Sequence, residues 1–168
     1  MPYTYKDGKG IENDMNAQSL PFYKSINSWL VVSLILAVIG LGISGYLTYT
    51  KLQNIDPVCS ESTGFDCGAV QSSVYSEVIG IPVQYLGLLG YLEILGLLVA
   101  EIQNTRLAEF APILLVGITL FGFGFSLYLT YIEAFVLEEW CQWCVVSALV
   151  MTTLFVISSI RAYQLIQD

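Results

Sequence analysis

Four cysteines in two closely spaced pairs are the residues of this chain best suited to chemistry. Cys59 and Cys67 are separated by seven residues, and Cys141-Gln142-Trp143-Cys144 forms a C-x-x-C pair. The C-x-x-C spacing brings both sulfurs into the first turn of a helix, close enough for a small redox-active disulfide ring. The unpaired N–H groups of that turn favour a thiolate, whereas the nearby Glu138 and Glu139 oppose it. The pattern therefore predicts thiol–disulfide exchange.

Three other interpretations of the cysteines remain open. They are two permanent structural disulfides, a four-cysteine zinc site, and inert buried thiols. Zinc is disfavoured because the seven-residue spacer is unusual for a zinc ligand pair and an oxidising compartment disfavours thiolates. We therefore expect no metal. Histidine is absent from the sequence, which excludes a histidine base.

The elements that carry the cysteines are apolar. Hydrophobic residues make up 55% of the 168 residues and charged residues only 12%, against about 25% in a soluble domain. Four runs carry no charge apart from Glu93, and each is long enough to cross a bilayer. We predict an all-α integral membrane protein, a bundle of four transmembrane helices at about 29–50, 82–103, 110–132 and 141–162.

The remaining segments complete a two-part organisation. Residues 1–28 are polar and are expected to form a cytoplasmic tail, and residues 29–163 the transmembrane catalytic domain. In the outer loop 51–81, apolar residues recur at near-helical spacing among serines: Ala69, Val70, Val74 and Val78. This predicts a short amphipathic helix that lies in the interface as a lid over the bundle.

Basic residues set the expected orientation. Five of the six flank the same ends of the helices, and only Lys51 lies in the other loops. The positive-inside rule then places both termini in the cytoplasm and all cysteines on the periplasmic or extracellular side, where disulfides persist. With six basic residues and a net charge of −8, no nucleic-acid partner is expected.

A repeat supports the same arrangement. Gly40 to Tyr49 matches Gly122 to Tyr131 at seven of ten positions with an offset of 82, and the same offset carries Cys59 onto Cys141. The first and third helices therefore look like equivalent members of two helix pairs. The small residues of the repeat favour close helix packing, and its tyrosines favour a position at the interface.

Several segments resemble the vitamin K epoxide reductase family over roughly residues 29–160. They are Cys67-Gly68-Ala69-Val70-Gln71-Ser72-Ser73, Gly80-Ile81-Pro82-Val83, Leu86-Gly87-Leu88-Leu89-Gly90-Tyr91 and Cys141-Gln142-Trp143-Cys144-Val145-Val146-Ser147-Ala148-Leu149. The last segment is similar to the bacterial branch of the family.

The resemblance implies a role for each site residue. Cys144 would face a membrane quinone of the ubiquinone, menaquinone or phylloquinone type, and Ser73 would donate a hydrogen bond to it. Cys141 would exchange disulfides with the loop through Cys67, and Cys59 would meet an outside partner. Because many bacterial relatives carry a fused thioredoxin-like domain and this chain ends at Asp168, that partner is expected to be a separate thioredoxin-fold protein. Disulfide bond formation in exported proteins would follow, at a plasma (inner) membrane.

Two departures bear on the substrate. The animal enzymes have a tyrosine where this chain has Ala148, and an asparagine near the position of Pro82 that has no equivalent here. Both favour simple quinone reduction over the first alternative, a vitamin K quinone or epoxide reductase. A second alternative is a non-catalytic tetraspan scaffold with structural disulfides. A third, the other bacterial quinone-linked disulfide oxidase family, has its C-x-x-C in the first pair rather than the second.

Glu93 is the only acid deep in a predicted helix. Acids within the membrane are costly and often functional. Either a neutral packing role or a proton relay is expected, and the packing role is favoured because Glu93 lies well inward of the cysteines.

Overall fold

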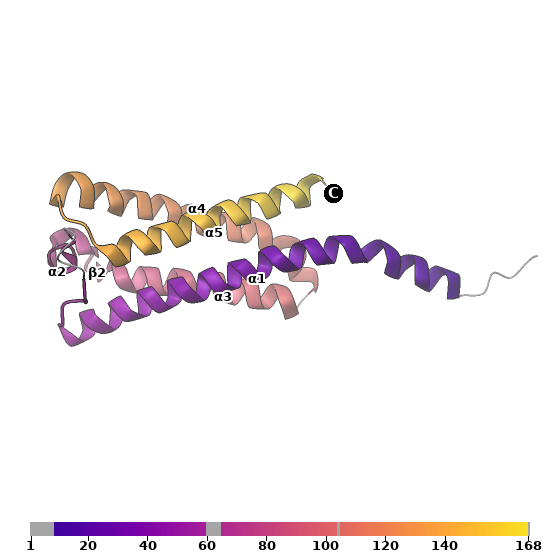
Figure 1. The fold of residues 1–168 in the computed structure, drawn as a ribbon, viewed down its shortest axis with the longest axis horizontal. Coiled ribbons are helices and arrows are strands. Elements are labelled where there is room, and N and C mark those ends of the chain that lie inside the picture. Colours follow the sequence, from indigo (N-terminus) through magenta and orange to yellow (C-terminus); the bar gives the residue numbers. More distant parts are fainter. Residues whose placement is uncertain (1–8, 60–64, 104, 168) are drawn as a thin grey trace, which may run out of the picture.

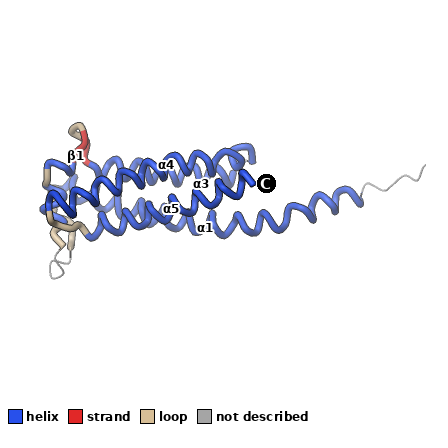
Figure 2. The backbone as a smooth tube through the Cα atoms, turned by 90° about the horizontal axis from the view of Figure 1, so that it is seen from above, coloured by secondary structure: helices blue, strands red, loops and turns tan. Residues whose placement is uncertain are grey.

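Four long helices run alongside one another in an antiparallel bundle (Figures 1 and 2). The computed structural model describes residues 9–59, 65–103 and 105–167, of which 9–27 and 105–109 are described by their backbone only. The helices are α1 (Lys9–Gln53), α3 (Val83–Gln103), α4 (Thr105–Ile132) and α5 (Gln142–Gln167). Each contains a stretch long and apolar enough to cross a membrane. The predicted four-helix transmembrane bundle is thereby confirmed.

Helix α1 is longer than expected. It begins at Lys9 and continues without a break into the apolar stretch that starts at Ser28, so most of the segment expected as a loose polar tail is helical; residues 1–8 lie outside the described residues. Extending a helix that has already nucleated costs far less than starting one, which explains why the polar residues add turns to the transmembrane helix. These turns project beyond the rest of the bundle (Figure 1).

The lid is shorter and more broken than the single amphipathic helix that the sequence predicts. Helix α2 (Cys67–Ser72) has six residues and stops where Ser73 adopts an extended backbone, and the 3₁₀ turn η2 (Val74–Ser76) follows. The chain then forms a hairpin of β1 (Glu77–Val78) and β2 (Ile81–Pro82). Ile79 and Gly80 at its tip both have positive φ, as a tight two-residue hairpin turn requires. Val78 therefore lies on a strand.

The helices form two pairs, as the repeat predicts. Helix α1 packs most extensively on α3, and α4 on α5. A side chain at Gly40 would overlap the ring of Tyr91 from α3, and one at the equivalent Gly122 would meet the thioether of Met151 from α5. Each repeat therefore uses a small residue at the same position to admit a large side chain from its partner helix. The two pairs share one buried core: Ala37, Tyr91, Ile94, Leu98, Leu115, Val150, Met151 and Leu154.

The end of the bundle opposite the cysteines is closed by an ion pair. Arg161 of α5 donates to Glu101 of α3, and both side chains are buried. In the sequence, Arg161 is one of the five basic residues that flank the same ends of the helices. The structure instead places it inside the bundle, where it joins one helix from each pair.

Candidate active site

All four cysteines lie together at one end of the bundle. Cys59 and Cys67 form a disulfide with their Cα atoms 6.0 Å apart, within the usual range for such a bond. Cys141 and Cys144 are free thiols. The buried Cys67 and Cys141 belong to one cluster, against which Cys59 and Cys144 pack. The structure therefore combines a disulfide with an adjacent dithiol, which is the arrangement that thiol–disulfide exchange requires.

The segment that carries Cys59 is held against α5. The Val58 carbonyl accepts a hydrogen bond from Trp143 Nε1 at 2.9 Å, and the Val58 N–H donates to the Tyr46 hydroxyl at 3.0 Å. The rings of Tyr46 and Trp143 also contact each other, with centroids 5.2 Å apart. Tyr46, expected at the lipid interface, instead positions the first cysteine beside the C-x-x-C segment.

Cys67 is positioned by the start of α2 and by a backbone contact. The Asp66 side chain caps this helix by accepting from the Ala69 N–H at 2.8 Å. The Asp66 N–H donates to the Trp140 carbonyl at 3.0 Å, beside a bridge between Phe65 and Trp140. Each of these bonded residues directly precedes a cysteine, so the backbone itself aligns Cys67 with Cys141.

Cys141 occupies the position that caps α5. Its carbonyl accepts the first helical hydrogen bond from Val145, and its sulfur accepts from the Cys144 N–H at 3.4 Å and from the Cys144 thiol at 2.8 Å. The bond from the Cys144 thiol lowers the pKa of Cys141, in opposition to the effect of burial. In this hydrogen bond Cys144 is the donor and Cys141 the acceptor.

Glu133 is a site residue that the sequence analysis did not identify. It is the first residue of a π-helical turn, Glu133–Leu137, that continues α4, and its side chain is buried. Its Oε2 accepts from the Cys141 N–H at 3.2 Å, and the carboxyl group also interacts with the Cys144 thiol. A signal was present in the sequence, because Glu133 is the acid that directly follows a long uncharged run, and acids near the membrane are often functional. The structure adds a second indication, since π turns are frequent at functional sites.

A cavity of about 450 Å³ lies beneath the lid, among the four helices, and this volume is typical of small-molecule sites. Cys144 and Glu133 line it, as do Ser73 and Ala148, whereas Cys141 does not. The two thiols of the C-x-x-C pair therefore face different surroundings. Cys144 borders the cavity, and Cys141 packs among the loop cysteines.

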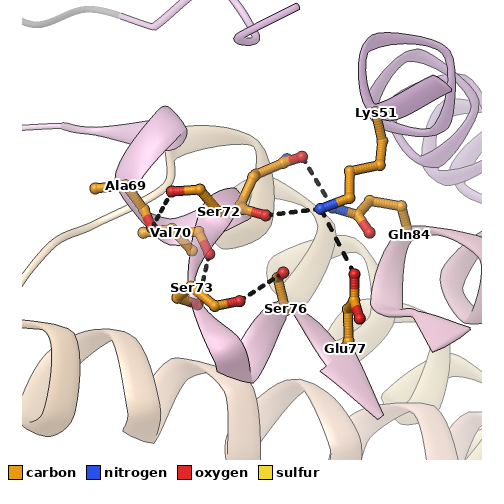
Figure 3. A network of polar contacts seen from close by, with 9 residues as sticks. Lys51, Ala69, Val70, Ser72, Ser73, Ser76, Glu77 and Gln84 are labelled. Atoms are coloured by element: carbon orange, nitrogen blue, oxygen red, sulfur yellow. Dashed lines mark hydrogen bonds and ion pairs between the residues drawn. The ribbon is translucent and has the colours of Figure 1, made fainter. Parts of the chain in front are cut away.

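The lid is fastened to α1 by one lysine (Figure 3). Lys51 Nζ donates to the Gln71 carbonyl at 3.2 Å and forms a longer ion pair with Glu77 at 3.9 Å. Within the lid, the Ser73 hydroxyl donates to the Val70 carbonyl at 2.8 Å, and the Ser76 hydroxyl to the Ser73 carbonyl at the same distance. Ser73 lines the cavity, and in this structure its hydroxyl proton is bonded within the lid.

Two glutamines on the cavity wall carry unsatisfied polar atoms. Gln84 Nε2 donates to Gln71 Oε1 at 2.9 Å, which leaves Gln71 Nε2 and Gln84 Oε1 buried without a hydrogen-bond partner. Buried polar atoms are nearly always bonded, so an orphaned donor beside an orphaned acceptor suggests a polar ligand or water at this position. Neither glutamine was predicted. Glu93 also borders the cavity but is exposed, which does not fit the favoured packing role.

Comparison with known proteins agrees with this geometry. The fold and the site together define a four-helix membrane protein with two interacting cysteine pairs. The family model described as the vitamin K epoxide reductase family matches residues 31–159. The chain therefore belongs to the vitamin K epoxide reductase family, and the resemblance noted from its segments is confirmed.

One curated relative is the thiol-disulfide oxidoreductase LTO1 of Arabidopsis thaliana. It is 33% identical over 124 residues, which is 68% of this chain but 32% of the relative. The chain thus spans about a third of the length of the curated relative that it matches. The name of that protein describes thiol–disulfide chemistry.

Proposed function

We propose that this chain is a membrane thiol–disulfide oxidoreductase that moves electrons from a thioredoxin-fold partner to a quinone. The observation that carries the proposal is the position of Cys144. Its thiol lies at the junction between a cluster of four cysteines and an apolar cavity. Electrons that arrive through the cysteines can leave only where a sulfur meets an acceptor, and Cys144 is the cysteine on the cavity wall.

The cavity residues fit a quinone. Most of the wall is aliphatic or aromatic, as an apolar ring and tail require, and it lies within the span of the four transmembrane helices. The orphaned Gln71 Nε2 could donate to a quinone oxygen, and the orphaned Gln84 Oε1 could accept from the hydroxyl of the reduced form. When bound, a quinone supplies an acceptor for two electrons and two protons.

The cysteines can deliver those electrons in two exchanges followed by one oxidation. A reduced dithiol of the partner opens the Cys59–Cys67 disulfide at Cys59, which is the less buried of the two. Cys67 then attacks Cys141 of an oxidised C-x-x-C pair, because these two buried sulfurs share one cluster. Each of these exchanges replaces one disulfide by another, so the free-energy change per exchange is small. The resulting Cys141 and Cys144 dithiol is then oxidised to a disulfide again, with its two electrons and two protons accepted by the quinone.

The orientation follows from the charges. We infer that the cysteine end faces the periplasm or the extracellular space and that both termini are cytoplasmic, because in the sequence five of the six basic residues flank the helix ends opposite the cysteines. Disulfides persist on that outer side. Labelling of cysteines in intact cells by a membrane-impermeant maleimide, after mild reduction, tests this orientation. Labelling that requires cell lysis would reverse it.

The function is tested with purified protein in detergent, a reduced thioredoxin-fold dithiol and a soluble quinone. Loss of quinone absorbance should track dithiol oxidation in the parent protein and disappear in Cys144→Ala. Turnover that persists in Cys144→Ala would contradict the assignment of Cys144. If the parent protein gives no turnover and both cysteine pairs stay disulfide-bonded under mild reductant, the scaffold alternative would be correct.

A further inference from the structure

Glu133 connects the C-x-x-C pair to the cavity. It lies just beyond the apolar run of α4, at the start of a π turn that ends at Glu138, a residue with positive φ. Such backbone departures persist where surrounding contacts hold them, and they cluster at functional sites. The turn keeps Glu133 inside the bundle, where its side chain is 4% exposed.

The carboxyl group touches both thiol-bearing residues. Oε2 accepts from the Cys141 N–H at 3.2 Å, the carboxyl interacts with the Cys144 thiol, and the same side chain lines the cavity. Among the described residues, Cys141 and Cys144 are the titratable groups that act on Glu133. Among the described residues, Glu93 is the other acid that borders the cavity, but its side chain is exposed whereas Glu133 is buried.

Closing the C-x-x-C disulfide requires a base that accepts the thiol proton of Cys144. The Cys144 thiol donates its proton in a hydrogen bond to the Cys141 sulfur, and it must lose that proton before the two sulfurs can bond. The Cys144 thiol is partly buried, and the sequence contains no histidine to accept the proton. A carboxylate beside the thiol is the remaining base of suitable strength.

We propose that Glu133 is a catalytic proton carrier, which takes the thiol proton of Cys144 and passes it to the acceptor in the cavity. The inference rests on the proposed function. In the step, the Cys141 thiolate bonds to the Cys144 sulfur, and two electrons pass to the quinone. The Cys144 proton travels through Glu133 to one quinone oxygen, and the second proton reaches the quinone from solvent.

The central variant is Glu133→Gln, because glutamine can still accept from the Cys141 N–H but cannot carry the proton. The matched control is Glu139→Gln, which removes an acid two residues before Cys141. In pre-reduced protein mixed once with quinone, Glu133→Gln should slow quinone reduction about a hundredfold, the lower end of the effect of general acid–base groups. Glu139→Gln should react at the parent rate.

A second readout needs no quinone. Diamide, a thiol oxidant, closes the Cys141–Cys144 disulfide in a Cys59→Ser/Cys67→Ser background, and closure is followed by a gel-shift label for free thiols. Glu133→Gln should slow this closure and flatten its pH dependence, whereas a merely structural role would leave Glu133→Gln like the parent. Parent-like rates in both assays would overturn the proposal.

The two assays separate the possible failures. If the parent protein does not reduce quinone but Glu133→Gln still slows diamide closure, the proposed acceptor is wrong and Glu133 remains the base for Cys144. If Glu133→Gln does not fold, Glu133→Asp retains a carboxyl one methylene shorter. It should keep the pH dependence of closure at a reduced rate, and a loss of that dependence would contradict a proton-carrying role.

Discussion

The ring of Tyr91 occupies the space that a side chain at Gly40 would need, and the Tyr91 hydroxyl continues across the bundle to bond the Ser147 carbonyl at 3.0 Å. One tyrosine thus contacts the first helix pair through its ring and the second through its hydroxyl. Tyr91 and Ser147 both line the cavity. Helix packing and the shape of the site therefore depend on the same side chain.

Gly40→Ala should be destabilising because the added methyl group would overlap the Tyr91 ring. A rigid aromatic ring cannot yield as a flexible chain can, so overpacking should lower the free energy of unfolding by about 1–3 kcal/mol. Gly42→Ala is the control, since nothing lies within 4 Å of its added methyl group. Unfolding in mixed detergent micelles measures both. Equal stability of the two variants would refute the close packing of Tyr91.

Gly122→Ala should cost less than Gly40→Ala, although the two positions are equivalent in the repeat. Its neighbour is the flexible end of Met151, whose sulfur would be 2.8 Å from the new methyl group and can move aside. Gly124→Ala has open space around it and serves as the control. The same unfolding assay applies. If Gly122→Ala lost more stability than Gly40→Ala, the Met151 side chain would be held as firmly as the Tyr91 ring.

Cys144→Ala should raise the pKa of Cys141, because it removes the thiol hydrogen bond that lowers it. The thiolate absorbance of Cys141, titrated in a Cys59→Ser/Cys67→Ser background, gives the midpoint. With Cys144 present, the pKa of Cys141 in the folded state lies below its pKa in the unfolded state. The folded state then binds fewer protons between the two values, and the stability of the reduced protein rises with pH in that window. This contribution is lost as the pH falls through the folded pKa. An unchanged midpoint in Cys144→Ala would contradict the assignment.

Trp143→Phe should expose the Cys59–Cys67 disulfide to reduction. The change removes the Nε1 bond to the Val58 carbonyl and leaves the weaker contact from Gln142 at 3.4 Å. Loss of one hydrogen bond, at about 0.5–1.5 kcal/mol, corresponds to about two- to tenfold faster reduction by a small dithiol. Trp140→Phe is the control, because Trp140 contacts Asp66 through its backbone carbonyl. Similar rates for both variants would exclude a specific role for the Trp143 indole.

Arg161→Met should destabilise the bundle by about 3–5 kcal/mol, because it leaves the Glu101 carboxylate buried without a counter-charge. Replacing both partners, Glu101→Leu with Arg161→Met, should recover most of this loss, since an apolar pair avoids the desolvation penalty. Unfolding of the single and double variants makes the comparison. A double variant no more stable than the single would indicate that the pair does more than neutralise charge.

The sequence is sufficient to predict the elements whose signals are local. Long uncharged runs predict the four helices, because a transmembrane helix must be apolar over the thickness of the bilayer. The repeat at Gly40 and Gly122 predicts how the helices pair, because close helix packing requires small residues. The clustering of the cysteines follows as well, since both pairs lie at the same ends of the helices.

The remainder depends on contacts between distant segments. Glu133 is one of several loop acids until the π turn directs it inward, and Gln71 and Gln84 are ordinary polar residues until the lid brings them together. Arg161 is indistinguishable in sequence from a surface charge. The lid was predicted as one helix because apolar spacing alone does not reveal the extended backbone at Ser73.

The pairing of α1 with α3 and of α4 with α5 gives each half of the chain its own pair of cysteines. Among the described residues, no disulfide joins the two halves, and α3 ends at Gln103, at the end of the bundle remote from the sulfurs. In the proposed mechanism, Cys67 of one helical hairpin attacks Cys141 of the other, so the exchange does not require an unbroken polypeptide. Two separately translated hairpins could reconstitute the relay, and a gene encoding one could have been duplicated to produce the other.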